Sequence, residues 1–191
     1  KILIVDFGSQ FTQLIARRVR ELGVYSEIIS HKKFKSKLDK KKIRGIILSG
    51  GPLNVYQSKK VKFDKKIFKY NIPILGICAG HQFMARHYGG DARESPEPEY
   101  GAMSIELVNG GGAIFANTAD TQTVWESHND EVHVVPEGFY ITASSDSCKV
   151  QGMENENGDR FGLQFHPEVN DSEFGKEMFE NFVEVCRAAK N

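Results

Sequence analysis

The first half of the chain alternates short apolar runs with segments of helical periodicity, and this alternation narrows the possible folds most. The apolar runs carry few charges, as is typical of strands buried on both faces. They lie at 2–7, 25–30, 45–52 and 72–77. Segments with apolar residues at helical spacing lie at 11–22, 60–70 and 79–88, the first capped by Ser9 and ended by Gly23. This alternation favours a parallel sheet with helices on both faces.

The second half of the chain has a different pattern, in which short strand-like segments are joined by turn residues. These segments lie at 103–108, 123–127, 139–145, 148–154 and 160–166, and a last helix is expected to start at Ser172. We therefore predict one α/β domain over residues 1–191. Its mostly parallel central sheet lies between two helical layers, as in a flavodoxin-like three-layer sandwich, and antiparallel strands are added in the C-terminal half.

The composition of the chain bears on its cellular location. Of its 191 residues 40% are hydrophobic, which suffices for one sizeable core. No apolar run approaches the ~18 residues that span a bilayer, and the opening KILIVDFGSQ predicts a strand rather than a secretion signal. Three widely spaced cysteines, Cys78, Cys148 and Cys186, argue against a disulfide framework. We expect no membrane contact and a reducing, cytoplasmic location.

The net charge of zero conceals a strong asymmetry between the two halves. The first 90 residues contain 19 Lys and Arg against 5 Asp and Glu, and the remaining residues contain 6 against 20. Lysines crowd the segment 32–66, which raises the possibility of nucleic-acid binding. That segment has no zinc or helix-turn-helix signature. We therefore predict no nucleic acid and interpret the segment as a solvated face or a docking face for an acidic partner.

Cys78 lies where an apolar run meets a helical segment, in the sequence GICAG at 76–80. A strand that turns sharply into a helix presents the residue at the turn, and small neighbours such as Gly76 and Gly80 permit the tight backbone. The helix that begins at Ala79 directs its N–H groups toward the sulfur, which favours a thiolate. Isolated apolar cysteines are most often buried packing residues. The glycine frame nevertheless favours Cys78 as a nucleophile.

A thiol nucleophile needs a base, and His166 is the best placed of six histidines. His81 and His87 lie on the helix after Cys78 and are poor candidates. Pro167 favours an extended backbone at His166, so that His166 and Glu168 are predicted to project from one face. A carboxylate beside an imidazole orients the ring and stabilises its charged form. The alternative is a surface histidine with a chance acidic neighbour.

The sequence SGGP at 49–52 ends another predicted parallel strand. Its glycines leave backbone N–H groups accessible, and with the N–H of Ala79 they could form an oxyanion hole. A phosphate-binding loop is the competing interpretation, although the lysine and Ser/Thr of such a loop are missing. No C-x-x-C or H-E-x-x-H pattern occurs, so we predict no metal site.

Taken in order, SGGP, GICAGHQ and FHPEV resemble the class I (triad) glutamine amidotransferases, and the resemblance covers nearly the whole chain. Within that family, the opening DFGSQFTQLIARRVRELGVYSEI is similar to the amidotransferase domains that serve GMP synthesis. The segments EYG at 99–101 and VWESHNDEV at 124–132 are similar as well.

The resemblance implies a catalytic triad of Cys78, His166 and Glu168, which hydrolyses L-glutamine to glutamate and ammonia through a cysteine thioester. It implies an oxyanion hole formed by the N–H groups of Gly51 and Ala79. Substrate-binding positions follow in the same way and are Gln82, His128, Asn129 and Asp130. The backbone at 127–130 would recognise the α-amino and carboxylate groups of glutamine. The family usually has glycine where Asn129 stands.

The resemblance also implies a partner. Ammonia would pass to an ATP-pyrophosphatase domain or subunit that aminates adenylated XMP to GMP. ATP and Mg²⁺ are expected on that partner and no cofactor in this domain. No SGGVDS-type loop occurs in these 191 residues. Three alternatives stay open: a glutaminase of another amidotransferase pathway, a cysteine hydrolase similar to PfpI, and a non-enzymatic subunit that docks through its lysines.

Overall fold

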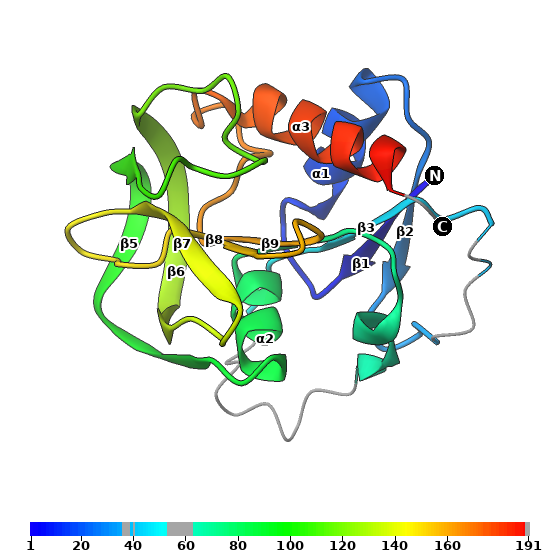
Figure 1. Cartoon of the computed structure of the whole chain (residues 1–191), viewed down its shortest axis with the longest axis horizontal. Coiled ribbons are helices and arrows are strands. Elements are labelled where there is room, and N and C mark those ends of the chain that lie inside the picture. Colours follow the sequence, from blue (N-terminus) through cyan, green and yellow to red (C-terminus); the bar gives the residue numbers. More distant parts are fainter. Residues whose placement is uncertain (36–38, 40, 53–62, 190–191) are drawn as a thin grey trace.

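The fold was analysed in a computed structural model that describes residues 1–35, 39, 41–52 and 63–189 (Figure 1). The elements of the N-terminal half are β1 (Ile2–Asp6), α1 (Thr12–Glu21), β2 (Ser26–Ser30), β3 (Gly45–Leu48), η2 (Lys65–Lys69), β4 (Ile74–Ile77) and α2 (Ala79–His87). Those that follow are β5 (Asp91–Leu107), β6 (Thr121–Val134), β7 (Phe139–Ser144), β8 (Gly152–Asn155), β9 (Arg160–Leu163) and α3 (Gly175–Ala188).

All strands join one nine-stranded sheet in the order β2-β1-β3-β4-β9-β8-β7-β5-β6. The neighbours from β2 to β9 are parallel, and those from β9 to β6 are antiparallel. The prediction of a parallel sheet with antiparallel additions in the C-terminal half is therefore confirmed. The two halves of the chain meet at the β4–β9 pair, which continues the parallel part.

Helices cover both faces of the sheet, with α1 and α3 on one side and α2 and η2 on the other (Figure 1). The first strand shows why. Ile2 and Ile4 pack into one buried cluster with side chains of α1 and α3, whereas Leu3 and Val5 pack into the other with side chains of α2. Alternate residues of a strand point to opposite faces, so an uninterrupted apolar run needs cover on both.

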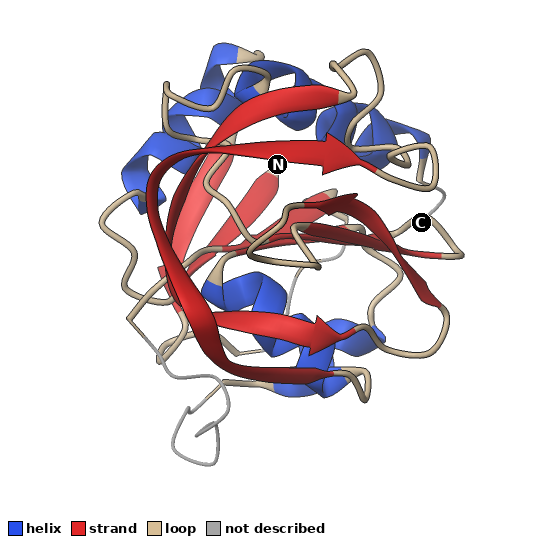
Figure 2. Cartoon of the chain, turned by 90° about the vertical axis from the view of Figure 1, so that its left-hand side faces the viewer, coloured by secondary structure: helices blue, strands red, loops and turns tan. Residues whose placement is uncertain are grey.

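The antiparallel pair β5–β6 is longer than the sequence predicted. The expected strands at 103–108 and 123–127 were wrong in length, because β5 has 17 residues and β6 has 14. Figure 2 shows them as long, bent ribbons. The pairing register shifts between Glu94 and Glu99, where two prolines interrupt β5. Prolines and exposed acidic residues are poor strand formers in sequence, and they are tolerated here at an irregularity.

Several expected boundaries also moved. Phe11, not Ser9, is the N-cap residue of α1, and the Ser9 hydroxyl accepts a hydrogen bond from the Phe11 amide instead. Of the helix expected at 60–70, residues 60–62 lie outside the described part, and the rest is a 3₁₀ turn capped by Asp64. The segments expected at 148–154 and 160–166 are β8 and β9, and α3 begins at Gly175 rather than Ser172. Among the described residues, no helix is long and apolar enough to cross a membrane.

Candidate active site

Cys78 is the single residue between β4 and α2, so it lies at the strand–helix turn that the glycine pattern predicted. Its backbone has φ 51° and ψ −109°, a conformation that L-residues rarely adopt. The glycines around it are needed for space. A Cβ on Gly76 would lie 2.7 Å from the backbone of Gly80, and one on Gly80 would lie 2.4 Å from the Leu48 carbonyl oxygen. The sequence therefore builds a tight elbow with the thiol at its apex.

His166 and Glu168 are joined by a hydrogen bond of 2.6 Å between Nδ1 and Oε1. The predicted contact is present, but an extended segment through Glu168 was wrong, because Pro167 and Glu168 lie in a turn. β9 ends at Leu163, and the amide of Val169 bonds to the His166 carbonyl at 3.3 Å in a turn. Pro167 occupies the second position of that turn, where its fixed φ is favoured. The turn folds Glu168 back onto the imidazole, and both side chains are almost fully buried.

The imidazole of His166 also lies beside Cys78. A Cβ built on Gly50 would be 3.1 Å from His166 Cε1 and 3.3 Å from Cys78 Cβ, so only a glycine leaves room between them. Burial disfavours the charged ring, but the charge of Glu168 and hydrogen bonds to Cys78 and Glu168 outweigh it. The pKa of His166 is therefore raised well above its usual value.

Three groups hold the His166 turn in place. The amide of His166 donates to the Trp125 carbonyl at 2.9 Å, and the Ser172 hydroxyl donates to the His166 carbonyl at 2.8 Å. Arg18 of α1 donates from Nε to the carbonyl of Glu168 at 3.2 Å. Sequence analysis did not identify Arg18 or Ser172 as supports, because residues distant in sequence become neighbours only through the fold.

A cavity of about 360 Å³ opens beside the thiol. It is lined by Gly8, Ser9, Gln10, Phe11, Gly51, Pro52, Cys78, Gln82, Tyr100, Ser127, His128, Asn129, Asp130 and His166. Seven predicted site residues are in that set, while Glu168 lies behind His166. Residues 8–11 and Tyr100 were not predicted as cavity residues, whereas the backbone of Ser127 was part of the predicted segment 127–130. Residues 8–11 follow β1 directly, and ligands bind at the carboxyl ends of parallel strands, so that rule could have identified them.

The two predicted oxyanion donors lie at the ends of neighbouring strands. Ala79 is the first residue of α2, and its amide has no hydrogen-bond acceptor among the described residues; the same holds for Gly51. A Cβ on Gly51 would lie 2.1 Å from the Phe7 carbonyl oxygen, so glycine is required for the backbone to come this close. Both amides are therefore available for a ligand oxygen.

The predicted substrate-binding residues differ in what their side chains do. Gln82 donates from Nε2 to the Asp130 carbonyl at 2.8 Å and to Gln164 Oε1 at 3.2 Å. Asn129 accepts a hydrogen bond from the Tyr100 hydroxyl at the rim. His128 lines the cavity, but its ring is buried and bonds elsewhere. Burial raises the pKa of the Asp130 carboxyl, with a further contribution from Glu94.

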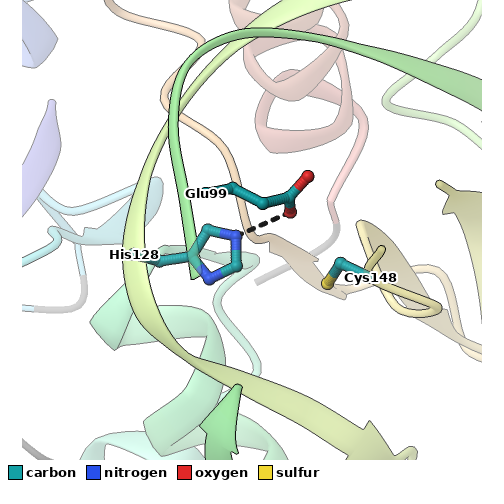
Figure 3. A group of neighbouring side chains, drawn as sticks. All are labelled: Glu99, His128 and Cys148. Carbon is teal, nitrogen blue, oxygen red and sulfur yellow. Dashed lines mark hydrogen bonds and ion pairs between the residues drawn. The ribbon is translucent and has the colours of Figure 1, made fainter. Parts of the chain in front are cut away.

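Glu99, His128 and Cys148 place one possible metal-ligand atom each within 4.8 Å of one another (Figure 3). The imidazole is already bonded to Glu99 at 2.8 Å, and the thiol of Cys148 donates to the Val150 carbonyl at 3.7 Å. Burial raises the pKa of that thiol, which keeps the sulfur protonated. We interpret the group as a hydrogen-bonded cluster, and the absence of a metal stays a prediction.

The fold and this site together define an α/β protein with a cysteine–histidine–glutamate arrangement. The chain belongs to the class I glutamine amidotransferase family, because the family model "Glutamine amidotransferase class-I" matches residues 3–186. It is 46% identical over its whole length to a glutamine-hydrolyzing GMP synthase of Ligilactobacillus salivarius, and 45% identical over 95% of its length to that of Bacillus mycoides. It spans 37% and 35% of these two relatives.

Solved structures give the same result. A protein of Thermoplasma acidophilum assigned to GMP synthase as one of its subunits superposes with a TM-score of 0.90 and 37% identity, covering 98% of this chain and 94% of that one. A glutamine amidotransferase from Thermotoga maritima superposes with a TM-score of 0.81 over 98% of this chain and 97% of its own. Because the two sequences are only 21% identical, this superposition shows a shared fold and nothing more.

Proposed function

We propose that this chain hydrolyses L-glutamine to glutamate and ammonia and supplies the ammonia for GMP synthesis. One observation carries the catalytic part: the His166–Glu168 pair, joined by a hydrogen bond of 2.6 Å, lies beside Cys78 at a cavity that is also lined by Gly51, whose backbone amide has no acceptor among the described residues. Membership of the class I glutamine amidotransferase family supports glutamine as the substrate.

In the proposed reaction, the Cys78 thiolate attacks the side-chain carbonyl carbon of glutamine. The amides of Gly51 and Ala79 stabilise the oxyanion that forms. His166, oriented by Glu168, gives a proton to the leaving nitrogen, and the C–N bond breaks to release ammonia and leave a γ-glutamyl thioester. A water molecule then gives a proton to His166 and attacks the thioester, which releases glutamate and restores the thiolate.

We further propose that the ammonia is used by an ATP-pyrophosphatase domain or subunit that converts XMP to GMP. The names of the relatives support this pathway, and the chain spans about a third of their length, which leaves room in such proteins for a synthetase part. ATP and Mg²⁺ would bind to that part. A cytoplasmic location, without membrane or nucleic-acid partners, fits a supply of ammonia to nucleotide synthesis.

The test is ammonia release from glutamine by the whole protein that carries this chain, with XMP, ATP and Mg²⁺ present. Cys78→Ala should abolish release, because no other thiol lines the cavity in the described structure. Cys148→Ser is the matched control, since this buried cysteine is outside the cavity, and it should retain the parent rate. Equal release by the parent and Cys78→Ala would overturn the proposal. Hydrolysis of peptides but not glutamine would favour the PfpI-like alternative.

A further inference from the structure

A buried ion pair lies at the cavity wall, which includes His128. Glu99 on β5 and His128 on β6 are opposite each other in the antiparallel register. Their side chains are 2% and 1% exposed, and His128 Nε2 lies 2.8 Å from Glu99 Oε1 (Figure 3). Charged side chains are almost never fully buried unless they are paired, so this arrangement requires an explanation beyond ordinary packing.

The hydrogen bonds determine the proton positions on His128. Nδ1 lies 2.9 Å from the Asp130 carbonyl oxygen, which can only accept, so Nδ1 must carry a proton. Glu99 accepts from Gln151 at 3.1 Å and from Ser147 at 2.7 Å, as an ionised carboxylate does. Nε2 therefore donates to that carboxylate as well. With both nitrogens donating, His128 is an imidazolium.

The surrounding groups are consistent with one positive charge on this ring. Glu126 Oε2 lies 3.4 Å from Nε2, and its side chain is 0% exposed. Burial raises the pKa of Glu126 to about 8, so it is mostly neutral at pH 7. Burial also lowers the pKa of His81 to about 3, which removes a competing charge. The other titratable groups that face the pair are Cys148, Asp130 and His166.

The imidazolium is connected to the cavity through the backbone of β6. The Asp130 carbonyl that accepts from His128 also accepts from Gln82 of α2 at 2.8 Å. On the other side of His128 along the strand, the Ser127 carbonyl is 3.6 Å from Cys78 Sγ, on the side of the nucleophile. His128 thus lies between the Ser127 carbonyl, which faces Cys78, and the Asp130 carbonyl, which accepts from Gln82.

We propose that His128 is a positioning residue: its buried imidazolium, neutralised by Glu99, fixes the backbone at 127–130 in the form that binds glutamine. This inference rests on the proposed glutaminase function. The ring bonds to the Asp130 carbonyl, and it acts on the cavity through this part of the backbone. A neutral ring would have to give up its bond to Asp130 or to Glu99, and the cavity wall would lose its fixed shape.

The charge on His128 can be tested without any activity. In the whole protein labelled with ¹⁵N-histidine, the ring nitrogens of His128, assigned from the signals lost in His128→Asn, should both be protonated at pH 7.5. In Glu99→Gln, the side chain still accepts a hydrogen bond but carries no charge. His128 should therefore lose its second ring proton at a lower pH than in the parent. A neutral His128 ring in the parent at pH 7 would overturn the proposal.

Kinetics test the positioning role. Glu99→Gln should raise the KM for glutamine on the order of tenfold, which corresponds to the net free energy of about one hydrogen bond. Alkylation of Cys78 by iodoacetamide should change by less than about twofold, because the nucleophile and its base are untouched. As the pH increases, the KM of Glu99→Gln for glutamine should begin to rise at a lower pH than the KM of the parent, because His128 loses its second ring proton earlier in the variant. An unchanged KM, with active parent protein, would overturn the role.

Cys148→Ser is the matched control and separates this proposal from a metal site. A hydrogen-bonded pair of Glu99 and His128 does not need the thiol, so the KM and the His128 proton signals should stay as in the parent. Equimolar zinc in the purified protein, lost in Cys148→Ser together with activity, would overturn the proposal. An inactive parent would refute the proposed function, while the histidine spectra would still decide the charge.

Discussion

Cys78 combines a reactive group with an unfavourable backbone conformation. Holding an L-residue at φ 51° and ψ −109° costs roughly 1–3 kcal/mol, and the packing of β4 and α2 must offset that cost. Gly76 and Gly80 allow this packing, since a Cβ on either would collide with backbone atoms. The strain directs the thiol toward the cavity rather than into the core. The placement of this thiol is thus a property of the backbone as well as of the side chain.

Glu168→Gln tests how far the carboxylate controls His166. The amide keeps the size of the side chain but removes the charge that raises the pKa of His166. We expect the kcat for glutamine to fall on the order of 10²-fold or more, because proton transfer by an oriented base contributes about that much. Steady-state ammonia release measures it, and a kcat within twofold of the parent would contradict the prediction.

The same variant has a consequence for stability. The folded pKa of His166 lies above 6.5, so its pairing stabilises the fold fully below pH 6.5 and loses that effect as the pH rises through the raised pKa. The free energy of unfolding of the parent should therefore fall over that range more steeply than that of Glu168→Gln. Urea denaturation at several pH values compares the two slopes.

The sequence predicted the turn at Cys78 and the contact between His166 and Glu168 better than the groups that surround them. The glycines around Cys78 and the short His166–Glu168 spacing are local patterns with a local cause, and they could be read directly. The supports could not, because Arg18 is 150 residues from Glu168. The contact between His128 and Glu99 could not be predicted for the same reason, since it joins two strands whose register no sequence pattern indicates.

At the scale of elements, apolar strands were found from sequence and polar ones were underestimated. The parallel strands are buried on both faces and appear as apolar runs. β5 instead carries many exposed residues, so its first half resembles a loop. It remains a strand because it pairs with β6 along almost its whole length. Such pairing is a tertiary effect that intrinsic propensity does not contain.

Arg160, at the start of β9, binds the backbone of the segment that precedes β4. Its guanidinium donates to the carbonyls of Phe68, Tyr70 and Ile72, and the residue is 5% exposed. Arg160→Lys keeps the charge but offers one nitrogen in place of a planar fork. We expect the free energy of unfolding to fall by about 3 kcal/mol, because buried carbonyls lose their donors.

Chemical denaturation measures this effect. Arg187→Lys is the matched control, because Arg187 is an exposed arginine of α3 with a surface ion pair to Glu184, and its change should stay within about 0.5 kcal/mol. If the two variants were equally stable, the guanidinium fork of Arg160 would not be what fixes the segment before β4.

At the scale of the whole molecule, one sheet unites two halves of opposite charge. The basic half supplies the parallel strands β1 to β4 and Cys78, while the acidic half supplies His166, Glu168 and the β5–β6 pair. The cavity is lined by residues of both halves, and His128 in its wall belongs to a buried cluster with Glu99 and Glu126. The free energy of unfolding should therefore depend on the protonation of one carboxyl group in this cluster, which takes no part in the proposed reaction.

Glu126 is that group. Its pKa is about 8 in the fold, because of burial, whereas the pKa of an exposed glutamate is 4.5. Between these values the folded chain binds more protons than the unfolded one, so stability falls as the pH rises. Glu126→Gln removes this penalty without changing size. The variant should equal the parent near pH 4.5 and exceed it by roughly 3–5 kcal/mol at pH 9.

Urea denaturation from pH 5 to pH 9 tests the prediction, with Glu106→Gln as the control because that side chain lies exposed on β5. The control should follow the parent at every pH, whereas the advantage of Glu126→Gln should grow steadily and level off above pH 8. The His166 pair also loses stability toward alkaline pH, but it does so in both proteins and cancels in their difference. Parallel curves for Glu126→Gln and the parent would mean that Glu126 is ionised at neutral pH, and that the charge of His128 is shared by two carboxylates rather than one.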